Sequence, residues 1–487
     1  MRNLEGHSGR GLMKSTDWRL VIYYLLLILI GWANIYASVH SSEPTSIFDW
    51  DCRSGKQFVW ILTSFALAAL ILFVFNPRLY EGLSVPIYGF VILLLIAVIF
   101  LGIEVKGSRS WFEFGPIRFQ PAEISKISTS LMLATVMSQL GYRIGRMKDF
   151  IITAMIILVP MMIIVLQSET GSALVYVGFI FMLYREGLSG WLIFMVGMAI
   201  LTFILTLTAS PFTAILALAG IASFCIFLYS GRLKWWLMTG LPIIVLLAFV
   251  PTILEALCNP EVPSFWDKIK PTYILLGLLG ILIPTAIIVA FREGNRLSHL
   301  AVLSFIAGVA LVYSTDFIFN KVLQDHQRKR IEVLLGMKED PTGVGYNVNQ
   351  AKIAIGSGGF AGKGYLNGTQ TAYGFVPEQS TDFIFCTIGE EWGFLGSATV
   401  ILLYILLIWR IIKDAEKSRE AFTRIYGYCV ACCIFMHLFI NIGMTLGIMP
   451  VIGIPLPFVS YGGSSLWAFT ILLFIFIALH RNENKYF

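Results

Sequence analysis

The chain has 487 residues and a formal net charge of +6, with 57% hydrophobic residues, only 13% charged residues and a mean hydropathy of +0.79. Since soluble globular proteins carry about 25% charged residues, this composition excludes a soluble enzyme and indicates an integral membrane protein. Apolar runs of about 17 to 25 residues, long enough to cross a bilayer as helices, recur along nearly the whole chain.

Fourteen apolar runs are predicted to be membrane-spanning helices. They lie at residues 18–39, 57–75, 84–102, 123–141, 150–166, 171–184, 190–207, 211–229, 235–254, 272–291, 297–316, 382–409, 424–446 and 464–480. The predicted fold class is therefore an all-α polytopic membrane protein, with residues 1–487 in a single membrane domain of about 14 transmembrane helices.

The distribution of Lys and Arg predicts the orientation of the helices, because cytoplasmic loops carry the excess of these residues. The segment before the first span contains Arg2, Arg10 and Lys14, and the C-terminal tail contains Arg481 and Lys485. With an even number of spans, we expect both termini to be cytoplasmic.

The interval GSRSWFEFGPIRFQPAEISK, at the start of the fourth span, is predicted to lie on the outer face and carries Arg109, Trp111 and Gln120. It also contains Glu123 and Lys126, which are three residues apart and hence on one face of a helix. Ionisable residues at membrane depth are costly and usually pair or line a cavity. Glu123 and Lys126 are interpreted either as a structural ion pair or as part of a substrate cavity.

The longest polar interval, residues 317–381, is predicted to be a large outer loop and is rich in basic residues. These are Lys321, Arg328, Lys329, Arg330, Lys338, Lys352 and Lys363. A basic outer loop departs from the usual charge distribution, so an anion such as a pyrophosphate is a candidate ligand. The alternative is that these cations contact lipid headgroups or pair with Asp325, Glu332 and Glu339.

Two short motifs stand out within this loop. DPTG fits a type I turn, with Asp340 first, Pro341 second and Gly343 fourth. The glycines of GSGGFAGKG resemble a phosphate cradle, but Ser357 stands where a nucleotide-binding P-loop needs glycine, and Lys363 is followed by glycine rather than Ser or Thr. The sequence therefore predicts no nucleotide cofactor.

Irregular backbone is expected at MPVIGIPLPFVSYGGSS, residues 449–465, between the last two spans. Such backbone survives at membrane depth only when it is buried in protein or lines a water-filled cavity. Glu390 and Glu391 add two carboxylates near the start of the span at 382–409. Since all these intervals fall on the predicted outer side, the residues alone support chemistry or transport at an outer-face cavity.

Four longer motifs resemble signatures of the SEDS (shape, elongation, division and sporulation) family. They are RFQPAEISK, DPTGVGYNVNQAKIAIGSGGFAGKGYLNGTQ, FVPEQSTDFIFCTIGEEWGFLG and PLPFVSYGGSS, in the family's order. Within the family, AIGSGG, GKG and GTQ look like the RodA, or elongation, branch rather than the FtsW, or division, branch.

This resemblance implies a peptidoglycan glycosyltransferase that polymerises lipid II, a polyprenyl-pyrophosphate-linked disaccharide pentapeptide, at the outer face of the cytoplasmic (inner) membrane during cell elongation and shape maintenance. Asp340 matches the family's essential loop aspartate, and is expected to act either as a general base or as a ligand of a divalent cation, Mg²⁺ or Mn²⁺. Residues expected to bind the lipid II head group or pyrophosphate are Arg109, Trp111, Gln120, Glu123, Lys126, Arg330, Lys352, Lys363, Gln370, Glu378, Asp382 and Ser460.

The resemblance also implies partners and alternatives. The expected partners are a class B penicillin-binding protein, which is a transpeptidase, other membrane proteins of the elongation complex, and membrane lipids, but no nucleic acid. The alternative functions are a flippase that transports lipid II, or a scaffold for the transpeptidase without turnover of its own. A base in an outer loop is needed for polymerisation, whereas neither alternative has an evident use for Asp340.

Two features depart from the family pattern. The family typically has ten spans, so about four further helices are expected to form an insertion at residues 208–296, with no assigned function. At the outer end of the fifth span this chain reads QSETGS where the family usually has QPDxGT, with Ser168 for proline and Glu169 for aspartate. The geometry of helix entry is expected to differ there, and Glu169 is not assigned a catalytic role.

Overall fold

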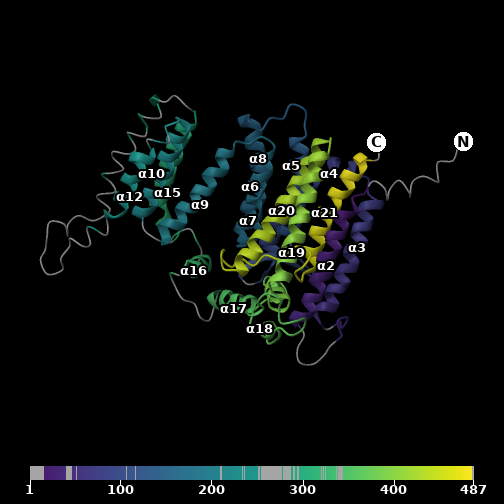
Figure 1. Cartoon of the computed structure of the whole chain (residues 1–487). Coiled ribbons are helices and arrows are strands. Elements are labelled where there is room, and N and C mark those ends of the chain that lie inside the picture. Colours follow the sequence, from purple (N-terminus) through teal and green to yellow (C-terminus); the bar gives the residue numbers. More distant parts are fainter. Residues whose placement is uncertain are drawn as a thin grey trace. The chain divides into compact units, whose positions relative to one another are not determined.

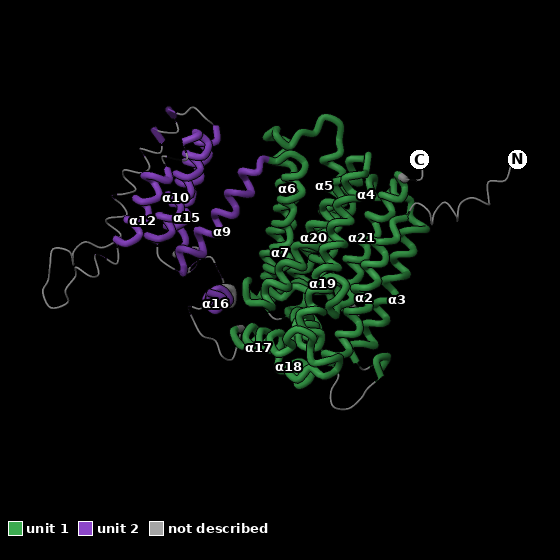
Figure 2. Tube along the Cα trace, in the orientation of Figure 1, with its two compact units in different colours: residues 1–188, 339–487 green, residues 189–338 purple. Residues whose placement is uncertain are grey.

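The computed structural model is mostly helical (Figure 1). It describes residues 16–39, 46–50, 52–105, 107–115, 117–208, 211–232, 234, 236–250, 253, 277, 284, 287–288, 291–292, 296–317, 319, 321, 323, 325–335, 337 and 344–484. The chain divides into two compact units, one formed by residues 1–188 and 339–487 and the other by residues 189–338 (Figure 2).

The first unit holds most of the helices. They are α2 (Trp18–Val39), α3 (Arg53–Phe73), α4 (Arg78–Leu101), α5 (Pro121–Met137), α6 (Met147–Leu166), α7 (Thr170–Val177), α8 (Phe179–Arg185), α17 (Val344–Ser357), α18 (Thr369–Ala372), α19 (Ile384–Lys417), α20 (Ala421–Thr445) and α21 (Gly463–Asn484).

The second unit contains α9 (Gly190–Thr208), α10 (Pro211–Tyr229), the π-helical turn η1 (Trp236–Gly240), α12 (Leu241–Ala248), α15 (Arg296–Phe317) and α16 (Asp325–Leu334). Helices α9, α10 and α15 pack against one another. Their core is apolar and includes Phe212, Ile215, Leu218, Phe305 and Val309. This unit therefore has a hydrophobic core of its own.

Ten helices in the described part of the chain are long and apolar enough to cross a bilayer. They confirm a polytopic helical membrane protein, while the count of fourteen stays a prediction. The predicted span at 171–184 is two short helices, α7 and α8, and the one at 235–254 is represented by η1 and α12. Most of the predicted span at 272–291 lies outside the described residues.

Helix α5, which corresponds to the predicted span at 123–141, has 17 residues and is not among the ten candidate spans. It is nevertheless almost entirely buried, because it packs against α4, α6 and α20. Several of its polar side chains hydrogen-bond to carbonyls of the same helix, as Ser125 does to Ala122 O at 2.7 Å and Ser130 to Lys126 O at 2.7 Å. Polar residues are thereby accommodated in a buried helix.

Helix α20 lies at the centre of the first unit. It contacts α5, α8, α19 and α21, and most of its residues are buried, while Phe435 and Phe439 form an exposed stripe. A helix with so much of its surface buried belongs to the core of a helical bundle. Polar side chains on it, such as His437 and Asn441, are therefore in the protein interior, where they need hydrogen-bond partners.

The first unit also contains a small antiparallel sheet, whereas only helices were predicted from the sequence. Strands β1 (Ile103–Val105), β2 (Ser108–Phe114) and β3 (Ile117–Phe119) occupy the interval between α4 and α5, in the order β1-β2-β3. Cross-strand ion pairs join Glu104 to Arg109 at 3.5 Å and Glu113 to Arg118 at 3.1 Å. Strand β2 contacts both α4 and α5.

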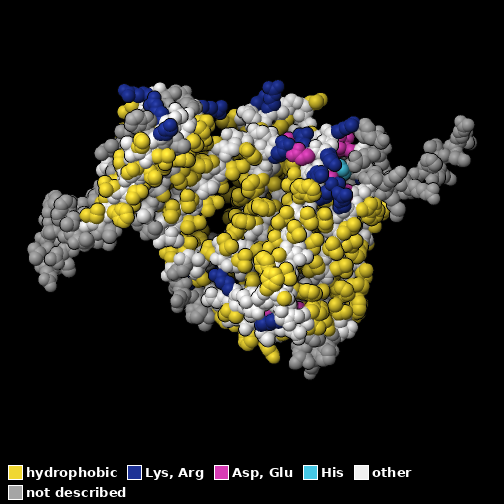
Figure 3. All heavy atoms as spheres, in the orientation of Figure 1, with side chains coloured by type: hydrophobic (Ala, Val, Ile, Leu, Met, Phe, Trp, Pro, Cys, Tyr) yellow, Lys and Arg dark blue, Asp and Glu magenta, His cyan; other side chains and the backbone are white. Residues whose placement is uncertain are grey.

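Figure 3 shows the surface of the protein by side-chain type. Hydrophobic side chains cover the helices along their length, and the Lys, Arg, Asp and Glu side chains in this view gather mainly near the ends of the helices. On α19, for example, Leu402 and Ile405 are each more than half exposed. Such a surface fits a lipid environment rather than water.

Candidate functional site

The predicted catalytic residue, Asp340, lies outside the described residues, as do Pro341, Thr342 and Gly343. The described chain resumes at Val344, the first residue of α17. The site is therefore characterised through the elements that follow Asp340 and through the residues predicted to accompany it.

Helix α19 is broken at Gly393, whose φ of 63° and ψ of −157° are not helical. The break leaves backbone carbonyls before it and N–H groups after it without partners in the helix. The glycine loop, residues 358–364, supplies these partners. Lys363 N donates to Glu390 O at 3.0 Å and Gly364 N to Glu391 O at 2.9 Å.

The other side of the break is satisfied by the same loop. Phe394 N donates to Gly359 O at 2.9 Å, and Leu395 N to Phe360 O at 3.2 Å. Gly362 has a φ of +82°, and a Cβ at this position would collide with the carbonyl of Glu391. Glycine is required here because the loop backbone lies directly against the helix. The glycine-rich stretch is thus the cap of a broken helix.

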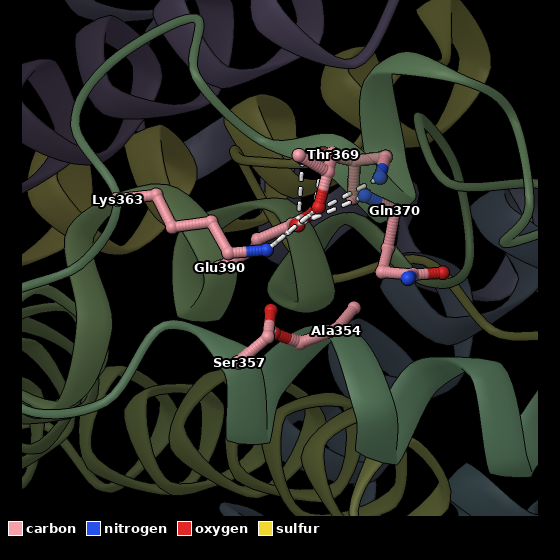
Figure 4. Close-up of polar contacts among 7 residues, drawn as sticks. Ala354, Ser357, Lys363, Thr369, Gln370 and Glu390 are labelled. Carbon is pink, nitrogen blue, oxygen red and sulfur yellow. Dashed lines mark hydrogen bonds and ion pairs between the residues drawn. The ribbon is translucent and has the colours of Figure 1, made fainter.

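Glu390, on the short helical segment before the break, ties the glycine loop to α18 (Figure 4). Its side chain is fully buried. Oε1 accepts hydrogen bonds from Lys363 Nζ at 2.7 Å and from the backbone N–H groups of Thr369 at 2.8 Å and Gln370 at 2.9 Å. Oε2 accepts from the N–H and the hydroxyl of Thr371, both at 2.9 Å. The carboxylate is therefore satisfied entirely by protein groups.

Two residues predicted to bind substrate, Lys363 and Gln370, lie in this cluster. The ammonium of Lys363 pairs with Glu390, and its side chain is 27% exposed. Gln370 contributes its backbone N–H, while its side-chain amide extends away from the carboxylate (Figure 4). Lys363 therefore has a structural role in positioning the loop, and its remaining exposed surface is what an anion could reach.

Glu123 and Lys126 form a buried ion pair. Lys126 Nζ lies 2.9 Å from Glu123 Oε1, each side chain is 2% exposed, and the ammonium also lies 2.8 Å from His437 Nε2 and 5.0 Å from the ring centroid of Phe469. Since an ammonium only donates, Nε2 of His437 accepts, and Nδ1–H donates to Pro455 O at 3.1 Å. His437 is thus a hydrogen-bonded intramembrane residue that links the ion pair to the segment at 449–465.

The segment 449–465 is also held by Asn441 and Ser460. Asn441 Nδ2 donates to Asp382 O at 2.8 Å and to Ile454 O at 2.7 Å. Ser460 Oγ donates to Thr381 O at 2.6 Å and accepts from Leu456 N at 2.8 Å. Of the predicted site residues, Ser460 therefore bonds to the residue before Asp382, and Asp382 is bonded through its carbonyl by Asn441.

Glu378 is the third predicted residue in this region. Its backbone has a φ of 52°, and its Oε2 accepts a hydrogen bond from Thr381 Oγ1 at 3.0 Å. The neighbouring Ser380 is bonded by Arg53 and by Tyr461 N at 2.8 Å. Glu378, Asp382 and Ser460 thus belong to one hydrogen-bonded layer formed by two irregular segments.

The remaining predicted residues lie elsewhere. Arg109 and Trp111 are on β2, where Arg109 pairs with Glu104. Lys352, on α17, is exposed and contacts Gly447 after the last turn of α20, a position where a cation is favourable. Arg330 is on α16, in the second unit.

The alternative reading of the basic loop is partly borne out on α16. Arg328 pairs with Asp325 at 3.4 Å and with Glu332 at 3.6 Å. These are two of the acidic residues that the sequence offered as partners. Part of the positive charge of the loop is therefore neutralised within one helix.

Gln120 and Glu169 form a polar cluster beneath the sheet. Gln120 is buried just before α5, and Glu169 Oε2 accepts from Ser108 Oγ at 2.9 Å and from Ser110 Oγ at 3.3 Å. Burial raises the pKa of Glu169 above its usual value, and the two serine hydroxyls only partly offset this. Ser168 has a φ of 62°, which a proline at this position could not adopt.

We expect the raised pKa of Glu169 to give the protein a pH-dependent stability. Between the unfolded and the folded pKa the folded state binds more protons, so stability should fall as pH rises through that window. Replacement by Gln removes the titration. Melting temperatures measured from pH 4 to 8 should therefore decline less for Glu169→Gln than for the parent protein. The control Glu113→Gln, at an exposed position, should retain the decline. Equal slopes for Glu169→Gln and the parent protein would contradict the raised pKa of Glu169.

Sequence reasoning did not include Glu390, His437, Asn441 or Glu169 among the site residues. The available signal was the presence of ionisable or strongly polar side chains in or next to membrane helices, which are usually paired or functional. Among the described residues, no group of three or more His, Cys, Asp or Glu side chains is arranged to hold a metal ion.

Comparison with known proteins gives consistent matches. Residues 17–215 and 275–485 match the FtsW/RodA/SpoVE family, described as "Cell cycle protein". The unmatched residues, 216–274, lie within the predicted insertion. The chain is 30% identical over 409 residues to "Peptidoglycan glycosyltransferase MrdB" of Escherichia coli K12, covering 84% of this chain and 80% of the relative. It is 31% identical over 471 residues to "Peptidoglycan glycosyltransferase RodA" of Treponema pallidum, covering 96% and 98%.

Solved structures show the same fold. A chain from a structure titled as a peptidoglycan synthase complex that coordinates polymerization and crosslinking has a TM-score of 0.57 and 24% identity, with 96% of this chain and 98% of that chain covered. A crystal structure of a variant of the rod shape-determining protein RodA of Thermus thermophilus has a TM-score of 0.51 and 22% identity, with the same coverage.

Proposed function

Since this chain belongs to the FtsW/RodA/SpoVE family of cell cycle proteins, we propose that it is a peptidoglycan glycosyltransferase that polymerises lipid II into glycan strands. The observation that carries the proposal is the match over most of the chain to relatives named as peptidoglycan glycosyltransferases. The proposed location is the cytoplasmic membrane, with the reaction at its outer face during cell elongation.

In the proposed reaction, the 4-hydroxyl of one sugar attacks the anomeric carbon of the next lipid-linked sugar. The hydroxyl proton passes to the carboxylate of Asp340, and the bond from the anomeric carbon to the pyrophosphate oxygen breaks, so that the pyrophosphate leaves with the electron pair. Positive charge is needed where the pyrophosphate develops. Among the described residues, the exposed Arg109 and Lys352 and the partly exposed Lys363 are available to provide it.

A divalent cation, Mg²⁺ or Mn²⁺, remains part of the proposal as a counter-ion of the pyrophosphate. Such ions are bound through carboxylates together with phosphate oxygens of the substrate. Asp340 would be the protein ligand in this case. The cation would supply charge stabilisation of the leaving group, while the described residues hold the loop that follows Asp340.

The buried cluster of Glu123, Lys126 and His437 also suits a protein that moves a charged head group through the membrane, so a lipid II flippase is the second candidate. A direct test incubates the purified chain with lipid II, alone and with its class B penicillin-binding protein, and resolves the products on a gel. Glycan strands made by the chain alone support the polymerase. If strands form only through the transpeptidase's own activity, the chain is a scaffold. If no strands form, the flippase is favoured.

The same cluster yields a prediction about stability. Lys126→Met leaves Glu123 buried without its partner, and losing one partner of a buried pair costs about 3 to 5 kcal/mol. The double variant Lys126→Met, Glu123→Gln removes both charges, so its melting temperature should recover while strand synthesis stays low. A double variant that regains stability and synthesis together would show that the pair is only structural.

The proposed orientation makes a prediction for labelling. A cysteine replacing Asn367, which is exposed between the glycine loop and α18, should react with a membrane-impermeant maleimide in intact cells. A cysteine replacing Lys417, exposed in the last turn of α19, should react only after the membrane is opened. Labelling of both positions from the same side would contradict the orientation.

The proposed partner is a class B penicillin-binding protein, acting with other membrane proteins of the elongation complex. This proposal is supported by the likeness to a chain from a peptidoglycan synthase complex. Co-purification of the chain with the transpeptidase from the same membranes would test it.

A further inference from the structure

Four aromatic side chains lie exposed around the glycine loop and the break in α19. Phe360 and Tyr365 come from the loop region and are 68% and 37% exposed, whereas Trp392 and Phe394 flank Gly393 and are 45% and 62% exposed. The rings of Phe360 and Phe394 stack with centroids 5.9 Å apart, and those of Tyr365 and Trp392 are also 5.9 Å apart. We call these four residues the loop aromatics.

The depth of the loop aromatics in the membrane can be estimated from the two helices that they contact, α2 and α19. An ion pair between Asp17 and Arg410 joins the start of α2 to the far end of α19. From Arg410, α19 runs 16 residues to Phe394, and from Asp17, α2 runs 16 residues to Ala33, so each path rises about 24 Å at 1.5 Å per residue. Tyr365 Oη donates to Ala33 O at 3.0 Å, so both paths end at the loop aromatics.

This height lies within the bilayer. Helices α2 and α19 are both candidate spans, and the hydrocarbon core of a membrane is about 30 Å thick. Because charges are costly inside the hydrocarbon core, we place the Asp17–Arg410 pair at its inner boundary, and a level about 24 Å above it then falls inside the core or at its boundary with the headgroups. The exposed surface continues without interruption along α19 through Leu395 and Leu402, which are 51% and 54% exposed.

Irregular backbone at this depth must have its polar groups satisfied. The glycine loop meets this requirement at five of its backbone groups, because Gly359 O, Phe360 O, Lys363 N and Gly364 N bond to α19, and Gly362 N bonds to Gly358 O at 2.9 Å. The loop therefore presents aromatic side chains outward and keeps its backbone against protein. This arrangement suits contact with lipid.

We propose that residues 358–366 are a re-entrant membrane element, and that the loop aromatics pack against the lipids of the leaflet distant from the N-terminus. The partner is the bilayer surface itself, and Tyr and Trp are the side chains enriched at such interfaces. The contact fixes the depth of the loop, with the Lys363–Glu390 pair at headgroup level. The lipid contact does not depend on the proposed function. The match between this level and the pyrophosphate of a lipid-linked sugar does rest on the proposed function.

The test is spin labelling in bilayer nanodiscs, in a background where the seven native cysteines are replaced and the melting temperature is unchanged. Single labels at Phe360→Cys, Leu402→Cys and Asn367→Cys are compared for relaxation by oxygen, which concentrates in lipid, and by a water-soluble nickel chelate. We expect the label at 360 to behave like the lipid-facing label at 402, with oxygen dominant. The label at 367 should be dominated by nickel.

A label at 360 that behaves like the one at 367 would overturn the proposal. If Phe360→Cys does not fold, the measurement is made on Trp392 instead, by subtracting the fluorescence of Trp392→Phe from that of the parent protein. In nanodiscs of brominated lipid this difference signal should lose more than half of its intensity, and an unquenched signal would equally contradict the lipid contact. Neither readout depends on glycan synthesis, so the proposed lipid contact can fail or succeed independently of the proposed function.

Discussion

Replacing Asp340 with Asn should lower glycan strand formation by about 10² to 10⁴ fold while the protein remains folded. The reason is that Asn can occupy the first position of the type I turn, so the loop is kept, whereas an amide cannot take the proton of the attacking hydroxyl. The measurement is the initial rate of strand formation from lipid II, with the melting temperature recorded for the same samples.

Glu339→Gln is the matched control, since it removes the neighbouring carboxylate of the same loop. It should retain a rate close to that of the parent protein. A folded Asp340→Asn protein that polymerises at the parental rate would refute the assignment of Asp340.

Replacing Glu390 with Ala should both destabilise the protein and abolish synthesis. The change leaves Lys363, which is 27% exposed, and the N–H groups of Thr369, Gln370 and Thr371 without their acceptor, and each donor left buried without a partner costs about 1 to 3 kcal/mol. The loop between α17 and α19 should then detach from the broken helix. The measurements are melting temperature and the rate of proteolysis within residues 358–372.

Glu416→Ala provides a control on the same helix. Glu416 pairs with Arg185 at 2.6 Å, but both side chains are well exposed, at 39% and 56%. An exposed pair contributes about 0 to 1 kcal/mol, so this variant should melt close to the parent protein. If Glu390→Ala melted no lower than Glu416→Ala, the carboxylate would not be the anchor of the loop.

The apolar helices could be predicted well from sequence, because length and hydropathy alone define a span. Helix α2 was predicted at 18–39 and is observed at those residues, and α9 and α10 agree within one residue. Helix α5 shows the limit of this reasoning, since it is buried by its neighbours rather than by lipid and tolerates Glu123 and Lys126 through partners on the same helix and on α20. A hydropathy pattern contains no information about such partners.

The site could be predicted only in part. The spacing of Glu123 and Lys126 predicted their pairing, and this is confirmed at 2.9 Å. The anchoring role of Glu390 could not be predicted, because three of its six donors are backbone N–H groups 19 to 21 residues earlier in the chain. The break at Gly393 could not be predicted either, because the backbone groups that it leaves unpaired are bonded by a loop about 30 residues away in sequence. In the sequence, the glycines of this loop resembled a phosphate-binding site.

The central claim is that this chain itself joins lipid II units, using Asp340. The most direct measurement is a time course with purified protein in liposomes that contain fluorescent lipid II and no transpeptidase, run in parallel for the parent chain and for Asp340→Asn. The account predicts a ladder of lengthening strands from the parent chain and none from the variant. Unchanged lipid II in both reactions, with lipid II moving between the leaflets in both, would contradict it.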